Sequence, residues 1–391
     1  MRRRVKLKDV CLDITVGHVG PMADEYVDVG IPFLRSQNIL PFRLDRSNLK
    51  FITEAFHRKL KKSALSPGDV AVVRTGYPGT ACVIPKGLPV ANCADLVVIR
   101  PSEELDSYYL CCLFNSAWGR STVAGSLVGV AQQHFNIGVA REMEVTLPPV
   151  EVQRRIASIL SAYDDLIENN TRRIKILEEM AQMVYREWFV NFRFPGHENV
   201  KMVESEVGPI PEEWQVTTLG RILTLEYGKA LKEADRHGGP VPVYGSSGVV
   251  GQHSEKLTSG PGIIVGRKGN VGSVFFCHPD FWVIDTAYYV RSDVSLYFLY
   301  FNLLSQNFLN NDAAVPGLNR NQAHSLPVVL PPDVGVLESF ERVVMPMFNL
   351  KRSLQLRNTN LRTTRDFLLP KLISGEVSVE TTEDAMLEAV G

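Results

Sequence analysis

Residues Leu65–Pro85 read LSPGDVAVVRTGYPGTACVIP, and residues Thr258–Pro279 read TSGPGIIVGRKGNVGSVFFCHP. Val70 aligns with Ile263 at an offset of 193 residues. The same offset aligns three further pairs, which are Arg74 with Arg267, Gly76 with Gly269 and Gly79 with Gly272. The chain therefore contains one sequence unit twice.

The similarity continues downstream of these two stretches. The tripeptide LPP occurs at 147–149 and again at 330–332, and a long helical pattern follows each copy. A unit of roughly 180 residues is too long for a solenoid repeat. We therefore predict two homologous globular domains, each followed by a helix and related by an internal pseudo-two-fold axis.

Composition is typical of a soluble globular protein of two or three domains, with 391 residues, 45% apolar and 22% charged residues. No apolar run is long enough to span a membrane, and the first residues, MRRRVKLKD, lack the apolar core of a secretory signal. The six cysteines form no C-x-x-C pair. Reduced thiols, a cytoplasmic location and the absence of zinc are therefore expected.

The formal net charge of −1 is low for a nucleic-acid-binding protein. Residues 376–391 contain five acids and no base, so the chain without them carries +4. We interpret these residues as an acidic, disordered tail. The charge of the remaining chain permits DNA binding but does not by itself indicate it.

The predicted fold class is α+β, with two homologous α/β domains separated by two long antiparallel helices that form an intramolecular coiled coil with pseudo-two-fold symmetry. The first domain covers residues 1–149. Its short β-branched runs at 69–73, 82–84 and 96–99 predict strands, and residues 107–118 predict a helix.

Residues 150–190 have the a/d pattern of a heptad helix. The predicted seam consists of Tyr163, Ile167, Asn170, Ile174, Leu177, Ala181, Val184 and Trp188. Charged residues, among them Asp164, Asp165 and Glu178, fill the other positions. The polar Asn170 is expected to fix the register, and Phe194-Pro195-Gly196 to end the helical region.

A connector at 191–213 leads to the second domain at 214–332 and to a second long helix at 333–375. The seam of this helix is predicted at Met347, Leu354, Leu361 and Leu368, with Phe340, Val344 and Leu350 between them. Pro346 is expected to kink or restart the helix. Two such helices of about 34 residues, each about 50 Å long, can bury their seams against each other and hold the domains at a fixed separation.

Motifs of common DNA-modifying enzymes are absent from the sequence. No acidic residue has Lys two positions later, both Pro-Pro pairs lack the amino-methyltransferase motif, and Gly228-Lys229 is not part of a P-loop. The sequence therefore favours a protein without an active site that binds no cofactor or metal.

Polar loops at repeat-related places suggest recognition of duplex DNA, a partner with two-fold geometry of its own. In the first domain the candidate residues are Arg35, Gln37, Asn38, Arg74, Gln132, Gln133, His134 and Asn136, with a phosphate-binding cluster of Arg58, Lys59, Lys61 and Lys62. In the second domain they are Lys229, Tyr244, Ser246, Ser247, Arg267, Lys268, Asn270, Asn319, Arg320, Asn321 and Gln322. The alternative for each loop is a turn whose polar residues satisfy only its own backbone.

Four segments resemble the specificity (S) subunits of type I restriction-modification systems. They are 147–156 (LPPVEVQRRI), 188–192 (WFVNF), 368–375 (LLPKLISG), and the stretch from 244–248 (YGSSG) to 266–269 (GRKG). The resemblance extends from about residue 6 to 377 and keeps the family order of domain, helix, domain, helix.

The resemblance implies a non-catalytic subunit in which each domain reads one half of a bipartite DNA site and the helices set the spacer. It also implies docking of two methyltransferase (M) subunits, which bind S-adenosylmethionine and methylate adenine at N6. Restriction (R) subunits would add ATP- and Mg-dependent translocation and cleavage. Two departures are the start of the second helix, which lacks the Gln-Arg-Arg of the first, and the near-neutral second domain, with nine bases and ten acids at 211–332.

Two other functions remain open from the residues alone. One is a self-sufficient nuclease or methyltransferase, which the missing motifs disfavour. The other is a duplicated protein-binding scaffold that grips a homodimeric partner without reading DNA.

Overall fold

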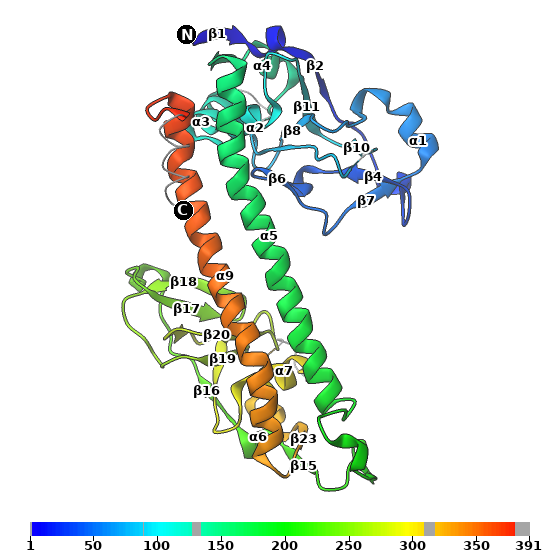
Figure 1. Cartoon of the computed structure of the whole chain (residues 1–391), viewed down its shortest axis with the longest axis vertical. Coiled ribbons are helices and arrows are strands. Elements are labelled where there is room, and N and C mark those ends of the chain that lie inside the picture. Colours follow the sequence, from blue (N-terminus) through cyan, green and yellow to red (C-terminus); the bar gives the residue numbers. More distant parts are fainter. Residues whose placement is uncertain (1, 89, 127–133, 309–316, 380–391) are drawn as a thin grey trace. The chain divides into compact units, whose positions relative to one another are not determined.

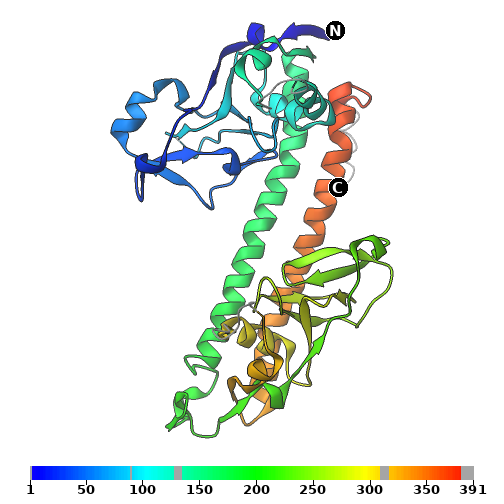
Figure 2. The same cartoon turned by 180° about the vertical axis from the view of Figure 1, so that it is seen from behind.

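The computed structural model describes residues 2–88, 90–126, 134–308 and 317–379. The chain divides into two compact units. Unit 1 contains Met1–Asn169 and Asn358–Gly391, and unit 2 contains Asn170–Arg357. Each unit combines one globular domain with a segment from each of two long helices, α5 (Val150–Phe189) and α9 (Val334–Ser374) (Figures 1 and 2).

The domain of unit 1 is built on an antiparallel sheet with the order β2-β11-β8-β9. These strands are β2 (Cys11–Val16), β11 (Leu96–Pro101), β8 (Val70–Val73) and β9 (Ala81–Val83). A second sheet has the order β10 (Asn92–Cys93), β4 (Ile31–Leu34), β7 (Lys50–Ile52) and β3 (Tyr26–Val27). Separately, β1 (Arg3–Lys6) pairs with β12 (Glu144–Leu147), and β5 (Ile39–Leu40) pairs with β6 (Arg43–Leu44). The strands predicted at 69–73, 82–84 and 96–99 are confirmed.

The described residues of this domain also form the α-helices α1 (Glu54–Lys59), α2 (Ser107–Asn115), α3 (Ala117–Gly125) and α4 (Ile137–Glu142). The single helix predicted at 107–118 is wrong at its C-terminal end, because Ser116 separates α2 from α3. The Ser116 hydroxyl donates to the Leu113 carbonyl at 2.7 Å and accepts from the Gly119 N–H at 3.2 Å. This side chain therefore satisfies the end of one helix and caps the start of the next.

The domain of unit 2 has the same sheet, with the order β16-β22-β19-β20. These strands are β16 (Thr224–Tyr227), β22 (Ala287–Arg291), β19 (Gly262–Gly266) and β20 (Val274–Cys277). Beside it lie the sheet β18 (Gly248–His253), β17 (Val241–Gly245) and β21 (Trp282–Val283), the pairs β15 (Gln215–Thr218) with β23 (Pro327–Leu330) and β13 (Met202–Ser205) with β14 (Gly208–Pro211), and the helices α6 (Leu219–Ile222), α7 (Leu296–Ser305) and α8 (Arg320–Ser325).

The strand registers confirm the sequence repeat. Val73, at the end of β8, pairs with Leu96, and Gly266, at the end of β19, pairs with Ala287. Each domain also contains one parallel pair, β4 with β10 in the first and β17 with β21 in the second. The offset of 193 residues read from the sequence therefore places equivalent strands in equivalent positions of two similar sheets.

Each unit has its own hydrophobic core, to which both long helices contribute. In unit 1 the sheet and α2 pack with Ile156 and Leu160 of α5 and with Leu369 and Leu372 of α9. In unit 2 the core is rich in aromatic residues, among them Tyr185, Phe189, Phe298, Phe301 and Phe340. Burial of these faces is the main source of stability of both helices.

The two helices run antiparallel within unit 1. The Asn358 amide donates to the Ile167 carbonyl at 3.3 Å, and Arg365, further along α9, forms an ion pair with Asp164, which lies earlier in α5. Most predicted seam residues are buried or half-buried, which confirms the heptad interpretation of α5.

The structure changes three expectations about the helices. α9 continues as one helix through Pro346, so the helix does not restart there. Leu350 is 40% exposed, and the buried residue at this level is Phe348. Asp164 lies outside the predicted seam and is nevertheless largely covered, since its side chain is only 18% exposed and accepts a hydrogen bond from the Tyr108 hydroxyl.

Candidate nucleic-acid interface

Two arginines of the second domain meet at the exposed ring of Tyr227, the last residue of β16. The guanidinium carbon of Arg267 lies 4.9 Å from the ring centroid, and that of Arg320 lies 5.1 Å from it. Arg267 also lies 5.7 Å from the Tyr288 ring centroid and donates from Nη1 to the Asp285 carbonyl at 3.2 Å. The sequence predicted both arginines as site residues but missed Tyr227.

A tight loop after β19 positions Arg267 and the exposed Lys268. Gly266 is needed here because an added Cβ would lie 2.2 Å from the Asn270 carbonyl oxygen. The Arg267 N–H donates to the Thr286 carbonyl at 2.8 Å, which anchors the start of the loop to the neighbouring strand. The Lys268 ammonium lies 3.7 Å from the Asp285 carboxylate, and the predicted Asn270 is exposed.

The start of α8 is joined to this loop. The Leu318 N–H donates to the Arg267 carbonyl at 2.8 Å, and the Tyr288 hydroxyl donates to the Leu318 carbonyl at 3.1 Å. The Asn319 side chain accepts from the N–H groups of Asn321 and Gln322, so it serves as the helix cap. Asn321 and Gln322 themselves are exposed.

The other predicted residues of the second domain have mixed surroundings. Tyr244 packs between Phe275 and Phe281, and burial raises the pKa of its hydroxyl. The Ser246 carbonyl accepts from the Ser273 hydroxyl at 2.5 Å, whereas Ser247 is exposed. The Lys229 ammonium lies 5.8 Å from the Trp282 ring centroid.

The equivalent edge of the first domain has different chemistry. Arg74 donates from Nη1 to the Asp95 carboxylate at 2.7 Å and from Nε to the Phe135 carbonyl at 3.1 Å. The Thr75 hydroxyl donates to the same carboxylate at 3.0 Å and lies 3.0 Å from His134 Nδ1. The structure thus brings Arg74 and His134 together, but around an acid that the sequence did not single out.

Further predicted residues of the first domain lie elsewhere or have structural partners. The Asn136 side chain accepts from the Val139 N–H and caps α4. Asn38 is 1% exposed and bonds to the backbone of Arg35 and Asp45, so it holds its own loop together. Arg35 is half-buried and donates to the Asn48 carbonyl. Five further predicted residues are exposed, namely Gln37, Arg58, Lys59, Lys61 and Lys62. The predicted Gln132 and Gln133 lie outside the described residues.

Metal-ligating clusters and reactive thiols are two features that catalytic sites often contain. No group of three or more His, Cys, Asp or Glu side chains could hold a metal ion among the described residues. All six cysteines are free, and burial raises the pKa of Cys82 to about 12 and that of Cys277 to about 11, so these thiols are poor nucleophiles at neutral pH. Within the same residues no helix could cross a membrane.

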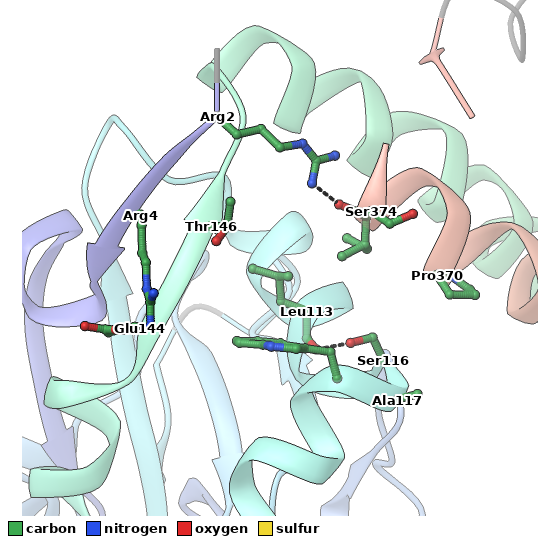
Figure 3. A pocket seen from close by; sticks show the side chains of 11 residues that line it. Arg2, Arg4, Leu113, Ser116, Ala117, Glu144, Thr146, Pro370 and Ser374 are labelled. Atoms are coloured by element: carbon green, nitrogen blue, oxygen red, sulfur yellow. Dashed lines mark hydrogen bonds and ion pairs between the residues drawn. The ribbon is translucent and has the colours of Figure 1, made fainter. Parts of the chain in front are cut away.

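A pocket of about 450 Å³ lies in unit 1 between β1, the α2–α3 corner and the end of α9 (Figure 3). Its walls include Trp118, Leu113 and Ile373. Arg2 donates to the Ile373 carbonyl at 2.6 Å, and Arg4 forms an ion pair with Glu144, so both cations have partners. The residues that line the pocket therefore come both from β1 and from the last turn of α9.

Comparison with known proteins identifies the family. The profile described as type I restriction modification DNA specificity domain matches residues 4–179 and 211–334. The MjaIX specificity subunit of Methanocaldococcus jannaschii is 27% identical over 311 residues, which cover 72% of each chain. The putative MjaX specificity subunit of the same organism is 26% identical over 200 residues, 49% of this chain and 46% of that one.

A solved structure shows the same fold. The crystal structure of a type I S subunit from M. genitalium matches with a TM-score of 0.64 at 15% identity, over 95% of this chain and 96% of the other. The two-domain, two-helix architecture expected from the sequence is therefore confirmed. Because the family profile covers most of the chain, this protein belongs to the specificity subunits of type I restriction-modification systems.

Proposed function

We propose that the chain reads a bipartite site in duplex DNA, with one half-site for each domain. The main support is that two domains with one framework carry different polar side chains at the same edge of the sheet. Around Arg74 lie Asp95, Thr75 and His134, whereas around Arg267 lie Tyr227 and Arg320. A duplicated frame with different contact residues suits a target whose halves differ in sequence.

The partners follow from the family. Two methyltransferase subunits would bind S-adenosylmethionine and methylate an adenine in each half-site, and restriction subunits would supply ATP- and Mg-dependent cleavage. On α5, the apolar side chains of Ile176, Met180 and Met183 are 40–57% exposed within unit 2. Their spacing places them on one face of the helix, which supports docking of a partner there.

The decisive experiment is a map of methylated adenines in the host genome with and without this chain. We expect one interrupted motif to disappear when the chain is removed, with its halves about one helical turn, roughly 34–36 Å, apart. Methylation that does not depend on the chain, together with a salt-independent complex that shifts no duplex, would favour the protein-binding scaffold instead.

A second measurement assigns the domains. We expect Arg267→Ala to weaken binding, and therefore methylation, only through the half-site read by the second domain, because the equivalent Arg74 belongs to the first domain. Unchanged affinity for every duplex would remove Arg267 from the interface.

A further inference from the structure

The shared framework allows a residue-by-residue comparison of the two domain edges. Val16 pairs with Val97 in the first domain, and Tyr227 pairs with Tyr288 in the second. Each pair lies one position beyond the pairing of Leu96 or Ala287 with the repeated strand. The two tyrosines of the second domain therefore replace two valines of the first.

The helices beside these edges, α4 and α8, begin alike but differ in the residue that follows the cap. Phe135 N–H donates to the Arg74 carbonyl at 3.2 Å, as the Leu318 N–H does to the Arg267 carbonyl. An asparagine then caps each helix, Asn136 on α4 and Asn319 on α8. The next residue is the apolar Ile137 in the first domain and the cationic Arg320 in the second.

The acidic residues near the arginines also differ between the two domains. Asp95, which directly precedes Leu96, neutralises Arg74 at 2.7 Å. The residue that precedes Ala287 is Thr286, which has no charge. The nearest acid, Asp285, accepts through its carbonyl from Arg267, while its carboxylate faces Lys268 at 3.7 Å. Among the described residues no acidic side chain forms an ion pair with Arg320.

Building on the proposed DNA-reading function, we propose that Arg320 reads a guanine in the half-site of the second domain and that Tyr227 orients it. A guanidinium that lies over an aromatic ring is restrained before binding, so its fork of N–H donors loses less entropy when it bonds to O6 and N7 of guanine. Arg267 lies over the same ring and is anchored to Asp285, so it supports this arrangement. Among the described residues of the first domain, the equivalent positions at this edge hold Val16, Ile137 and an Arg74 that is neutralised by Asp95.

The test uses cells in which the full chain or a variant is the only specificity subunit, with the methylated motif as the readout. We expect the wild-type motif to contain a guanine in one half-site, and Arg320→Gln to reduce the preference for it by about 10-fold, the order of discrimination of one bidentate contact. Arg320→Lys should keep a weaker preference for the same base. The other half-site should be unchanged in every variant.

Two further variants separate orientation from other effects. Tyr227→Leu should weaken the preference at the same position, and Tyr227→Phe should restore it, because only the ring is required. Arg291→Gln is the matched control, since this exposed arginine lies 5.4 Å from the Tyr289 ring centroid at the other end of β22. It should leave the motif unchanged.

Several outcomes would overturn the proposal. A wild-type motif without guanine in the affected half would do so. So would an Arg320→Gln protein that methylates all its sites more slowly with an unaltered motif, because that pattern identifies a phosphate contact. A failure of the DNA-reading function itself is seen earlier and differently, as the absence of any motif that depends on the wild-type chain.

Discussion

Asp164 and Arg365 show how single residues join α5 to α9 inside unit 1. Their side chains are 18% and 11% exposed, and the Tyr108 hydroxyl donates to the same carboxylate. Burial raises the pKa of Asp164, against the opposing influence of Tyr108 and Arg365. Removal of the acid would leave Arg365 with Asp366, 2.8 Å away, as its remaining carboxylate partner and would take the acceptor from the Tyr108 hydroxyl, so we expect Asp164→Ala to destabilise unit 1 by about 1–3 kcal/mol.

Hydrogen exchange of the α2 amides measures this loss. The control is Glu151→Ala, whose ion pair with Arg154 is 56–72% exposed and should contribute less than about 0.5 kcal/mol. If the two substitutions reduced the stability of unit 1 equally, the buried ion pair would contribute no more than the exposed one.

His278 provides a pH-dependent prediction in unit 2. Its ring packs 5.0 Å from Phe276, and its Nε2 is buried and unpartnered. Burial first, and then the positive charges of Arg352 and Lys351, lower its pKa to about 4. The unfolded chain binds this proton near pH 6.5, so acidification from 6.5 towards 4 favours unfolding.

We expect unit 2 to lose stability over this pH interval. His278→Phe should reduce the slope of stability against pH, as measured by hydrogen exchange of the β19 amides at several pH values. An unchanged slope would mean that His278 is protonated as easily in the folded state.

The candidate site was only partly predictable at this scale. Repeat-related loops identified Arg74, Arg267 and Arg320, because the repeat marks equivalent places. Tyr227 and Asp95 were missed because they approach these arginines only through strand pairing across long stretches of sequence. Asn136 and Asn319 are helix caps, and an exposed amide and a capping amide look the same in a sequence.

At the scale of elements, the long helices were predicted well because their heptad pattern is local. The error concerns α9, where Phe340, Val344 and Phe348 are buried at intervals of four. This spacing arises because α9 faces the aromatic core of unit 2 as well as the other helix, and that core is invisible in the local pattern. The a/d rule therefore selected Leu350 where the fold buries Phe348.

Two leucines of α9 test this difference with the same chemical change. Leu354 is fully buried and Leu350 is 40% exposed. We expect Leu354→Ala to destabilise unit 2 by about 2–5 kcal/mol, the usual range for a buried leucine, and Leu350→Ala by less than about 1 kcal/mol. Urea unfolding of the full chain, followed by the tryptophan fluorescence of unit 2, compares them. If Leu350→Ala costs as much as Leu354→Ala, the heptad assignment from the sequence is right after all.

At the scale of the whole molecule, the duplication was predictable from the repeated motif, but the division into units was not. The sequence assigns each helix to the domain before it, whereas the structure assigns residues 358–379 of the second helix region to the first domain's unit. Leu369, Leu372 and Val379 are buried in that core, and Arg2 donates to the Ile373 carbonyl. Which domain a helix face covers depends on tertiary packing, and no local pattern records it.

This organisation predicts an unusual response to truncation. A chain that ends at Arg357 lacks the part of α9 that covers Ile156 and Leu160, so the N-terminal domain should be destabilised although the deletion is at the other end of the sequence. We expect faster hydrogen exchange in β8 and β11, with little change in β19 and β22. A chain that ends at Val379 is the control and should exchange like the full chain. Addition of a peptide of residues 358–379 should slow the exchange of β8 again, because it restores the missing apolar face. If the shorter chain instead loses protection in β19 and β22, the C-terminal segment stabilises the second domain and the assignment of units is wrong.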